Sequence, residues 1–109
     1  MLPRPHRLRT DPDYSRVFSY KNRRDFNLFT LYLAPALYSV CRVGLVVSKR
    51  CGNSVHRHRI KRRLRAVMLS MLRLCPHNDL VIVAKPSLLT TPYVDMLNLL
   101  SQSLPLLCR

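Results

Sequence analysis

Residues 42–65, RVGLVVSKRCGNSVHRHRIKRRLR, predict a strand, a turn and the start of a long helix in direct succession. Residues 42–48 are almost continuously apolar, which is typical of a strand buried on both faces. The residues Gly52-Asn53-Ser54 then combine turn-forming and helix-capping chemistry. Beyond them, apolar side chains recur at helical spacing until Pro76 ends the helix; they are Ile60, Leu64, Val67, Met68, Met71, Leu72 and Cys75.

Shorter elements flank this unit on both sides. Thr10-Asp11-Pro12 predicts the start of a short helix in which Tyr14, Val17 and Phe18 share one face. Residues 24–33 are rich in β-forming residues and predict a strand, and residues 79–85 predict another, buried one. A last helix follows Thr91-Pro92, and its inward-facing side chains are expected to be Val94, Leu97, Leu100 and Leu104.

These elements follow the order helix, strand, strand, helix, strand, helix. A strand, a long helix and another strand in succession imply a crossover between parallel neighbours. The order therefore predicts an α+β fold with one small mixed sheet and helices on one of its sides. The length of 109 residues suits a single domain over residues 1–109, with residues 1–10 as an extended basic arm.

The charge of the chain indicates a polyanionic partner. Lys and Arg number 19 against five acidic residues, which gives a formal net charge of +14. So much like charge destabilises a compact fold unless a polyanion neutralises it. No apolar run is long enough to cross a membrane, and without a secretory signal we expect reduced cysteines in the cytoplasm. The four cysteines contain no CxxC pair, so no metal site is predicted.

The strongest functional pattern is the cationic segment 49–65, which contains eight Lys or Arg residues, two His and no acid. A solvated charged face usually interleaves both signs of charge, and cations in the first turns of a helix oppose its dipole. A bound polyanion relieves both penalties, and exposed amides at the helix start can also receive phosphate oxygens. One histidine and three basic side chains lie opposite the apolar stripe of the helix: His58, Lys61, Arg62 and Arg65.

A second pattern is a group of aromatic residues with basic residues between them. Such a mixture suits single-stranded nucleic acid, because bases stack on the rings and phosphates pair with the cations. For any one of these rings, a place in the hydrophobic core is the alternative interpretation. Strand alternation leads us to expect Phe26 in the core and Phe29 on an open face. The group consists of Tyr14, Phe18, Phe26, Phe29 and Tyr32.

The sequence contains no recognisable catalytic constellation. The five Asp are scattered, Glu is absent, and no glycine-rich phosphate loop is present. If the chain belongs to an enzyme, we expect a partner to supply the chemistry.

The segment 42–65 closely resembles the signature of the bacterial ribonuclease P protein family. That signature is a strand ending in Ser-Lys, a Gly-Asn turn, and an Arg-Asn-Arg box that continues Ile-Lys-Arg. The arm and first helix, and residues 79–86 with the sequence DLVIVAKP, look like other parts of the family, so the resemblance extends from about residue 4 to 104. One departure is that His58 occupies the middle of the box in place of Asn.

The resemblance implies an α-β sandwich like the second domain of ribosomal protein S5. It also implies that this chain assists an RNA subunit, which cleaves the 5′ leader from precursor tRNA with Mg²⁺ that it mainly holds itself. No catalytic residue is then expected in the protein, and one protein is expected for each RNA. A cleft between the first helix and the sheet would bind the leader through Tyr14, Phe18 and Phe29. The residues implied to contact the RNA subunit are Lys49, Arg50, Asn53, Arg57, His58, Arg59, Lys61, Arg62 and Arg65.

Two other functions fit parts of the pattern. A structural RNA-binding protein, of ribosomal or RNA-chaperone type, would also need the cationic helix, but it has no use for a leader-binding cleft. A cationic protein of the membrane surface is disfavoured, because the apolar stripe of the helix is needed for the core and leaves no face for lipid.

Overall fold

The computed structural model describes residues 7–20, 22–37, 41–71 and 78–107. A four-stranded sheet forms its centre, in the order β1-β2-β4-β3. The strands are β1 (Asn22–Asp25), β2 (Phe29–Pro35), β3 (Arg42–Val46) and β4 (Asn78–Ala84). The helices are α1 (Asp11–Ser19), α2 (Ser54–Met71) and α3 (Tyr93–Leu107), with short 3-10 helices η2 (Lys49–Cys51) and η4 (Pro86–Thr90).

The sheet is mixed, as the sequence predicted. Strand β4 pairs in parallel with β3 and antiparallel with β2. Helix α2 therefore makes the predicted crossover between parallel neighbours. The α+β class is confirmed.

The predicted strand over residues 24–33 is instead a hairpin. Residues 22–25 form β1 and pair antiparallel with β2, and the amide of Phe26 donates to the carbonyl of Phe29 at 2.8 Å. The turn at residues 26–28 contains neither Gly nor Pro, so its residues do not interrupt the β-forming pattern. The structure thus has one more strand than we predicted.

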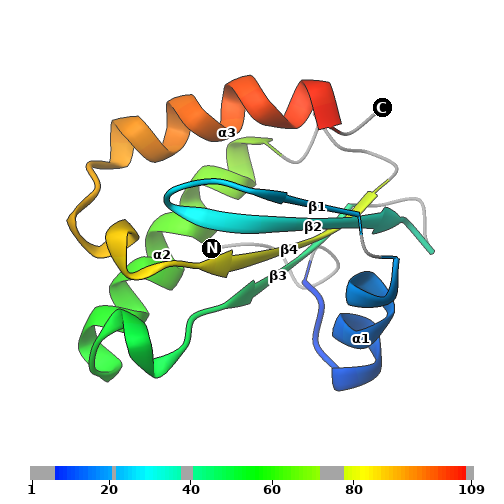
Figure 1. Ribbon diagram of the computed structural model, residues 1–109, viewed down its shortest axis with the longest axis horizontal. Helices are drawn as coiled ribbons and strands as arrows, with labels where there is room; N and C mark the ends of the chain where they lie inside the picture. Colours follow the sequence, from blue (N-terminus) through cyan, green and yellow to red (C-terminus); the bar gives the residue numbers. More distant parts are fainter. Residues whose placement is uncertain (1–6, 21, 38–40, 72–77, 108–109) are drawn as a thin grey trace.

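Helices cover both faces of the sheet, not one as predicted (Figure 1). Side chains of β2 alternate between the faces, with Phe29, Leu31 and Leu33 in the larger core and Ala34 in the smaller one. The larger core lies against α2, η4 and α3, and the smaller core lies against α1. Helix α1 and the end of the arm therefore pack on the face of the sheet opposite α2, η4 and α3.

Helix α1 begins where the sequence predicted. The hydroxyl of Thr10 accepts a hydrogen bond from the amide of Asp13, and Pro12 occupies the first turn. Val17 is fully buried in the smaller core, beside Leu8 of the arm. The amide of Leu8 donates to the carbonyl of Val43, so the end of the arm runs along β3; residues 1–6 lie outside the described residues.

The inward faces of α2 and α3 agree with the sequence in part. Ile60, Leu64, Val67 and Met68 of α2 are buried as predicted, whereas Leu72 and Cys75 lie outside the described residues. On α3 the prediction for Val94 was wrong, because this side chain is 60% exposed. Leu88 of η4 fills the core near the start of α3, so the helix first contributes its buried side chains at Met96 and Leu100.

Candidate nucleic-acid interface

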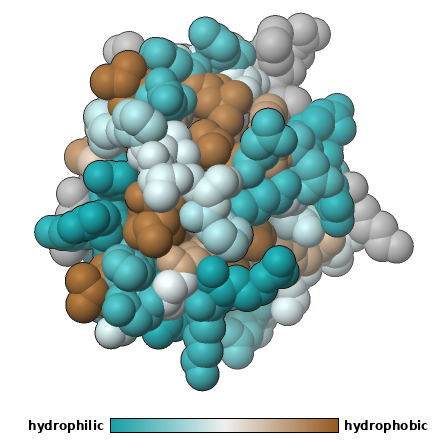
Figure 2. Space-filling model, turned by 60° about the vertical axis from the view of Figure 1, so that its left-hand side comes forward, coloured by the Kyte–Doolittle hydropathy of each residue, from teal (hydrophilic) through white to brown (hydrophobic). Residues whose placement is uncertain are grey.

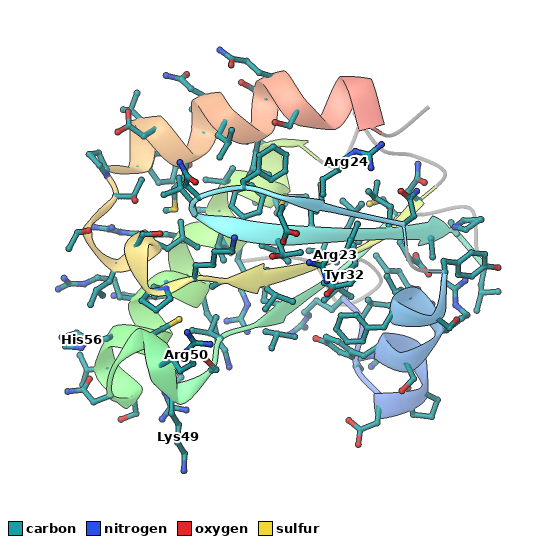
Figure 3. All side chains as sticks on the ribbon, in the orientation of Figure 1. Arg23, Arg24, Tyr32, Lys49, Arg50 and His56 are labelled. Atoms are coloured by element: carbon teal, nitrogen blue, oxygen red, sulfur yellow. The ribbon has the colours of Figure 1, made fainter. Side chains whose placement is uncertain are left out.

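The turn before α2 is built to begin a helix and to project cations. The Oδ1 of Asn53 accepts a hydrogen bond from the amide of His56 at 3.0 Å, so Asn53 caps the helix. Gly52 has a φ of +117°, and a Cβ there would lie 2.7 Å from the His56 ring. Just before this turn, the buried Cys51 anchors η2 and leaves Lys49 and Arg50 exposed at the end of the molecule (Figure 3).

The cationic side chains of α2 occupy two flanks of the helix. One flank faces the arm and α1: Arg57 and Lys61 line a hollow with His58, and Lys61 and Arg65 line another with Arg7. The other flank faces the start of α3 and carries Arg59 and Arg62 beside Arg63. The structure therefore places all the predicted RNA-subunit residues on one helix, its cap and the 3-10 turn before it.

Within the described residues, no acidic side chain forms an ion pair with this cationic surface. The ion pairs among the described residues join Arg16, Arg23 and Arg42 to aspartates, and none involves an α2 side chain. Neutralisation of the α2 charge by an external anion stays a prediction of the sequence pattern.

A second candidate surface is the partly exposed apolar surface between α1 and the sheet, which we call the α1 cleft because the family resemblance implies a cleft there. Its walls are half-buried apolar side chains packed over the smaller core: Tyr14, Phe18, Tyr32, Val46 and Val83. The rings of Phe18 and Tyr32 meet edge-to-face, with centroids 4.7 Å apart. The Tyr14 ring lies over Gly44, and burial raises the pKa of its phenol.

Phe29 does not belong to this cleft, so its predicted place on an open face was wrong. Its side chain has no exposed surface and lies in the larger core, on the other face of the sheet. The prediction counted strand alternation through residues 26–29, but residues 26–28 form the hairpin turn and alternation starts only at Phe29. Phe26, predicted to be in the core, is half-buried and packs against Phe29, with the two ring centroids 5.1 Å apart.

Sequence reasoning did not assign Tyr32 to the site. Successive side chains of a strand point to opposite faces, so Tyr32 points away from the face that holds Phe29, Leu31 and Leu33. The correct bounds of β2 would therefore have placed Tyr32 on the α1 face. Arg23 of β1 is the partner of Tyr32 in the ladder and lies beside it in Figure 3. A hollow of about 320 Å³ continues past the cleft, and its lining includes Thr30, Ser48, Arg50, Val83 and Lys85.

A buried ion network fixes α1 to the sheet. Asp79 of β4 is fully buried and pairs with Arg16 of α1 and with Arg42 of β3, the latter at 3.0 Å. Arg42 also pairs with Asp13, and Arg16 donates to the carbonyl of Pro35. These residues are far apart in the sequence, so no local pattern indicated the network. It holds the cleft wall formed by α1 in place.

Desolvation alone would raise the pKa of Asp13. The hydrogen bond from Thr10 and the charge of Arg42 outweigh that effect, so the pKa lies below its ordinary value of 3.8. The carboxylate of Asp13 beside Arg42 therefore stays ionised to a lower pH than an ordinary aspartate.

Two other site types find no support in the part of the chain that the structure describes. No group of three or more His, Cys, Asp or Glu side chains could hold a metal ion there. None of its helices is long and apolar enough to cross a membrane.

Comparisons with known proteins identify relatives of this chain. The family model for ribonuclease P matches residues 2–106. The ribonuclease P protein component of Rhodococcus jostii is 39% identical over 104 residues, which cover 88% of this chain and 83% of that protein. The corresponding protein of Streptococcus thermophilus is 30% identical over 95 residues, which cover 87% of this chain and 86% of the relative.

Solved structures show the same fold. The RNase P protein of Staphylococcus aureus superimposes with a TM-score of 0.84 at 21% identity, covering 95% of this chain and 98% of that one. The RNase P protein of Thermotoga maritima gives a TM-score of 0.80 at 20% identity, covering 91% and 94%. The chain therefore belongs to the ribonuclease P protein family, whose members are the protein components of a tRNA-processing ribonucleoprotein endoribonuclease.

Proposed function

We propose that this chain binds the RNA subunit of ribonuclease P through α2 and the 5′ leader of precursor tRNA through the α1 cleft. It thereby assists endonucleolytic removal of the leader in the cytoplasm, with one protein for each RNA. The RNA subunit performs the cleavage with Mg²⁺. As the family resemblance implies, we assign that ion mainly to the RNA subunit.

The unneutralised charge of α2 supports its role toward the RNA subunit. Phosphate contacts from Lys and Arg supply most of the affinity of a protein for RNA and release bound counterions. Such contacts set position and register more than sequence preference. The residues proposed to make them are those predicted: Lys49, Arg50, Asn53, Arg57, His58, Arg59, Lys61, Arg62 and Arg65.

The α1 cleft supports the role toward the leader. Its rings are held in place by packing yet remain partly accessible, which suits stacking of unpaired bases. Tyr14 and Phe18 stay in the proposed leader site. Tyr32 joins them, because its ring lies against Phe18, and Phe29 leaves the set because it is buried. Arg50 lines the hollow that continues the cleft and lies on the approach to α2, so it lies between the two surfaces.

The observation that carries the proposal is the presence of two surfaces of different chemistry on one small fold, which meet where Tyr14 lines a hollow with Lys61 and Arg65. A purely structural RNA-binding protein needs only the cationic helix. A protein that holds an RNA subunit and an unpaired leader at the same time needs both surfaces.

The decisive experiment is cleavage of a precursor tRNA by a bacterial ribonuclease P RNA at low Mg²⁺, with and without this protein. We expect the protein to restore accurate 5′ processing. Tight RNA binding without restored processing would contradict the proposal and favour a structural RNA-binding role.

Variants separate the two surfaces. Arg57→Ala with Arg59→Ala should weaken binding to the RNA subunit and flatten its salt dependence by about one unit of slope for each lost phosphate contact.

Phe18→Leu, which keeps an apolar side chain but removes the ring, should lower affinity for precursor tRNA by about 1–3 kcal/mol and leave mature tRNA affinity unchanged. Tyr20→Ala is the matched control, because Tyr20 is 52% exposed and lies outside the cleft. Equal losses for precursor and mature tRNA would exclude the leader assignment.

A further inference from the structure

A hollow between α2 and the start of α3 combines cations with an exposed aromatic ring. Its volume is about 490 Å³, and it is lined by Arg59, Arg62, Arg63, Ala66 and Tyr93. It lies on the flank of α2 that faces away from the arm and α1, so it is separate from the α1 cleft. We call it the α3 hollow.

One arginine of the α3 hollow is fixed by a hydrogen bond, and none of the three forms an ion pair with a described residue. Arg63 is half-buried, and its Nη1 donates to the carbonyl of Thr91 at 3.2 Å, which fixes this guanidinium against the loop before α3. Arg59 and Arg62 are exposed, and none of the three guanidinium groups pairs with a carboxylate among the described residues. Three cations that line one hollow with no acid in the lining favour a bound phosphate.

Tyr93 gives the hollow a second kind of contact. Its side chain is 39% exposed, although it opens a helix whose later residues Met96 and Leu100 are fully packed into the core. Ala66 also lines the hollow, with a small side chain. A ring beside an open volume and three arginines is the combination that proteins use to hold an unpaired nucleotide, with the base stacked and the phosphate paired.

The surface around the hollow favours RNA over an apolar partner. Figure 2 shows the side of the molecule on which η4 leads into α3: hydrophilic residues cover most of it, and the hydrophobic residues are separated by polar ones. The neighbouring Val94 is exposed, but it does not line the hollow. A polyanion that already contacts α2 would reach the hollow without leaving the helix.

We propose that the α3 hollow holds one unpaired nucleotide of the RNA subunit, with its base stacked on Tyr93 and its phosphate bound by Arg59, Arg62 and Arg63. The inference rests on the proposed binding of that RNA to α2 and adds a stacking contact at a position outside the predicted site. It makes Tyr93 and Arg63 binding residues of this chain.

The absence of tryptophan from the sequence allows a direct test. Tyr93→Trp introduces a single tryptophan whose ring can stack in the same place. Adding a bacterial ribonuclease P RNA should quench its fluorescence, whereas a fully paired RNA duplex of equal charge should not. Val94→Trp, one residue further along the same exposed turn, is the matched control and should report little change with either RNA.

Affinity measurements complete the test. Tyr93→Ala should weaken binding to the ribonuclease P RNA about tenfold with an unchanged salt slope, because the lost contact carries no charge. Tyr93→Phe should bind like the wild type, and Arg63→Gln should reduce the salt slope. Tight RNA binding without quenching at position 93, equal quenching by the duplex, or full affinity of Tyr93→Ala would each overturn the α3 hollow while leaving the role of α2 intact. If the wild-type protein does not bind the RNA, the proposed function itself is overturned, and this inference with it.

Discussion

The two faces of the sheet are made from alternate residues of the same strands, yet they are covered very differently. On the larger-core face, Phe29, Leu31, Leu80 and Ile82 have no exposed surface beneath α2, η4 and α3. On the other face, the short helix α1 leaves Tyr32, Val46 and Val83 half-buried. Because one face supplies most of the buried apolar area, the other can keep accessible rings for a ligand.

The largest expected effect comes from opening the larger core. Phe29→Ala should lower the free energy of unfolding by about 4 kcal/mol, since it removes a fully buried ring and leaves a cavity. Urea denaturation of the variant measures the loss. Phe26→Ala, in the adjacent turn, should cost clearly less. A stable Phe29→Ala variant with selectively weakened leader binding would place this ring in the cleft after all.

The next effect comes from the ion network beneath α1. Asp79→Asn should cost about 3 kcal/mol, because it leaves Arg16 and Arg42 without their shared buried carboxylate. Thermal or urea unfolding checks the size of the loss, and hydrogen exchange should show that the amides of α1 lose protection first. Asp25→Asn, which breaks an exposed pair with Arg23 but keeps an oxygen that can accept from the Thr30 hydroxyl, should leave stability within experimental error. Equal losses in the two variants would argue against the network as the anchor of α1.

A smaller change tests the cleft without opening either core. A Cβ on Gly44 would lie 2.6 Å from the Tyr14 ring, so Gly44→Ala should displace that ring at a cost of about 1 kcal/mol. Leader affinity should fall about fivefold, while affinity for the RNA subunit stays constant. Adding Tyr14→Leu should recover stability but not leader affinity. Unchanged leader binding in Gly44→Ala would remove Tyr14 from the site.

The smallest effect is a pH dependence of the α1 face. The folded-state pKa of Asp13 lies below 3.8, so the carboxylate stabilises the fold above that pH and loses its contribution as the pH falls through the folded pKa. The advantage of the wild type over Asp13→Asn should therefore shrink as the pH falls through 3.8 and below, and the change should be small because the pair is partly exposed. Parallel urea titrations at each pH measure this difference. A gap that widens as the pH falls would reverse the assigned sign.

The alternation of the strands shows how far sequence reasoning extends. It predicted buried strands at residues 42–48 and 79–85, where long apolar runs permit one interpretation. It failed at residues 24–33, because a turn without Gly or Pro separates two strands there. The alternation of faces begins anew at Phe29, so this ring lies on the face opposite to the predicted one. Val94 was misplaced for a related reason: helical spacing gives the relative positions of side chains, but η4 decides which of them face the core.

The candidate site divides in the same way. The cationic face of α2 follows from spacing within one helix, so the sequence alone determined which of its residues share a side and that segment 49–65 contains no acid. The sequence motif of residues 42–65 likewise identified the family. Only the tertiary structure decided that Tyr32 meets Phe18, that Asp79 joins Arg16 and Arg42, and that Tyr93 meets the α2 arginines. These contacts join residues distant in sequence, and their geometry depends on strand register and helix packing, which no local pattern of side chains specifies.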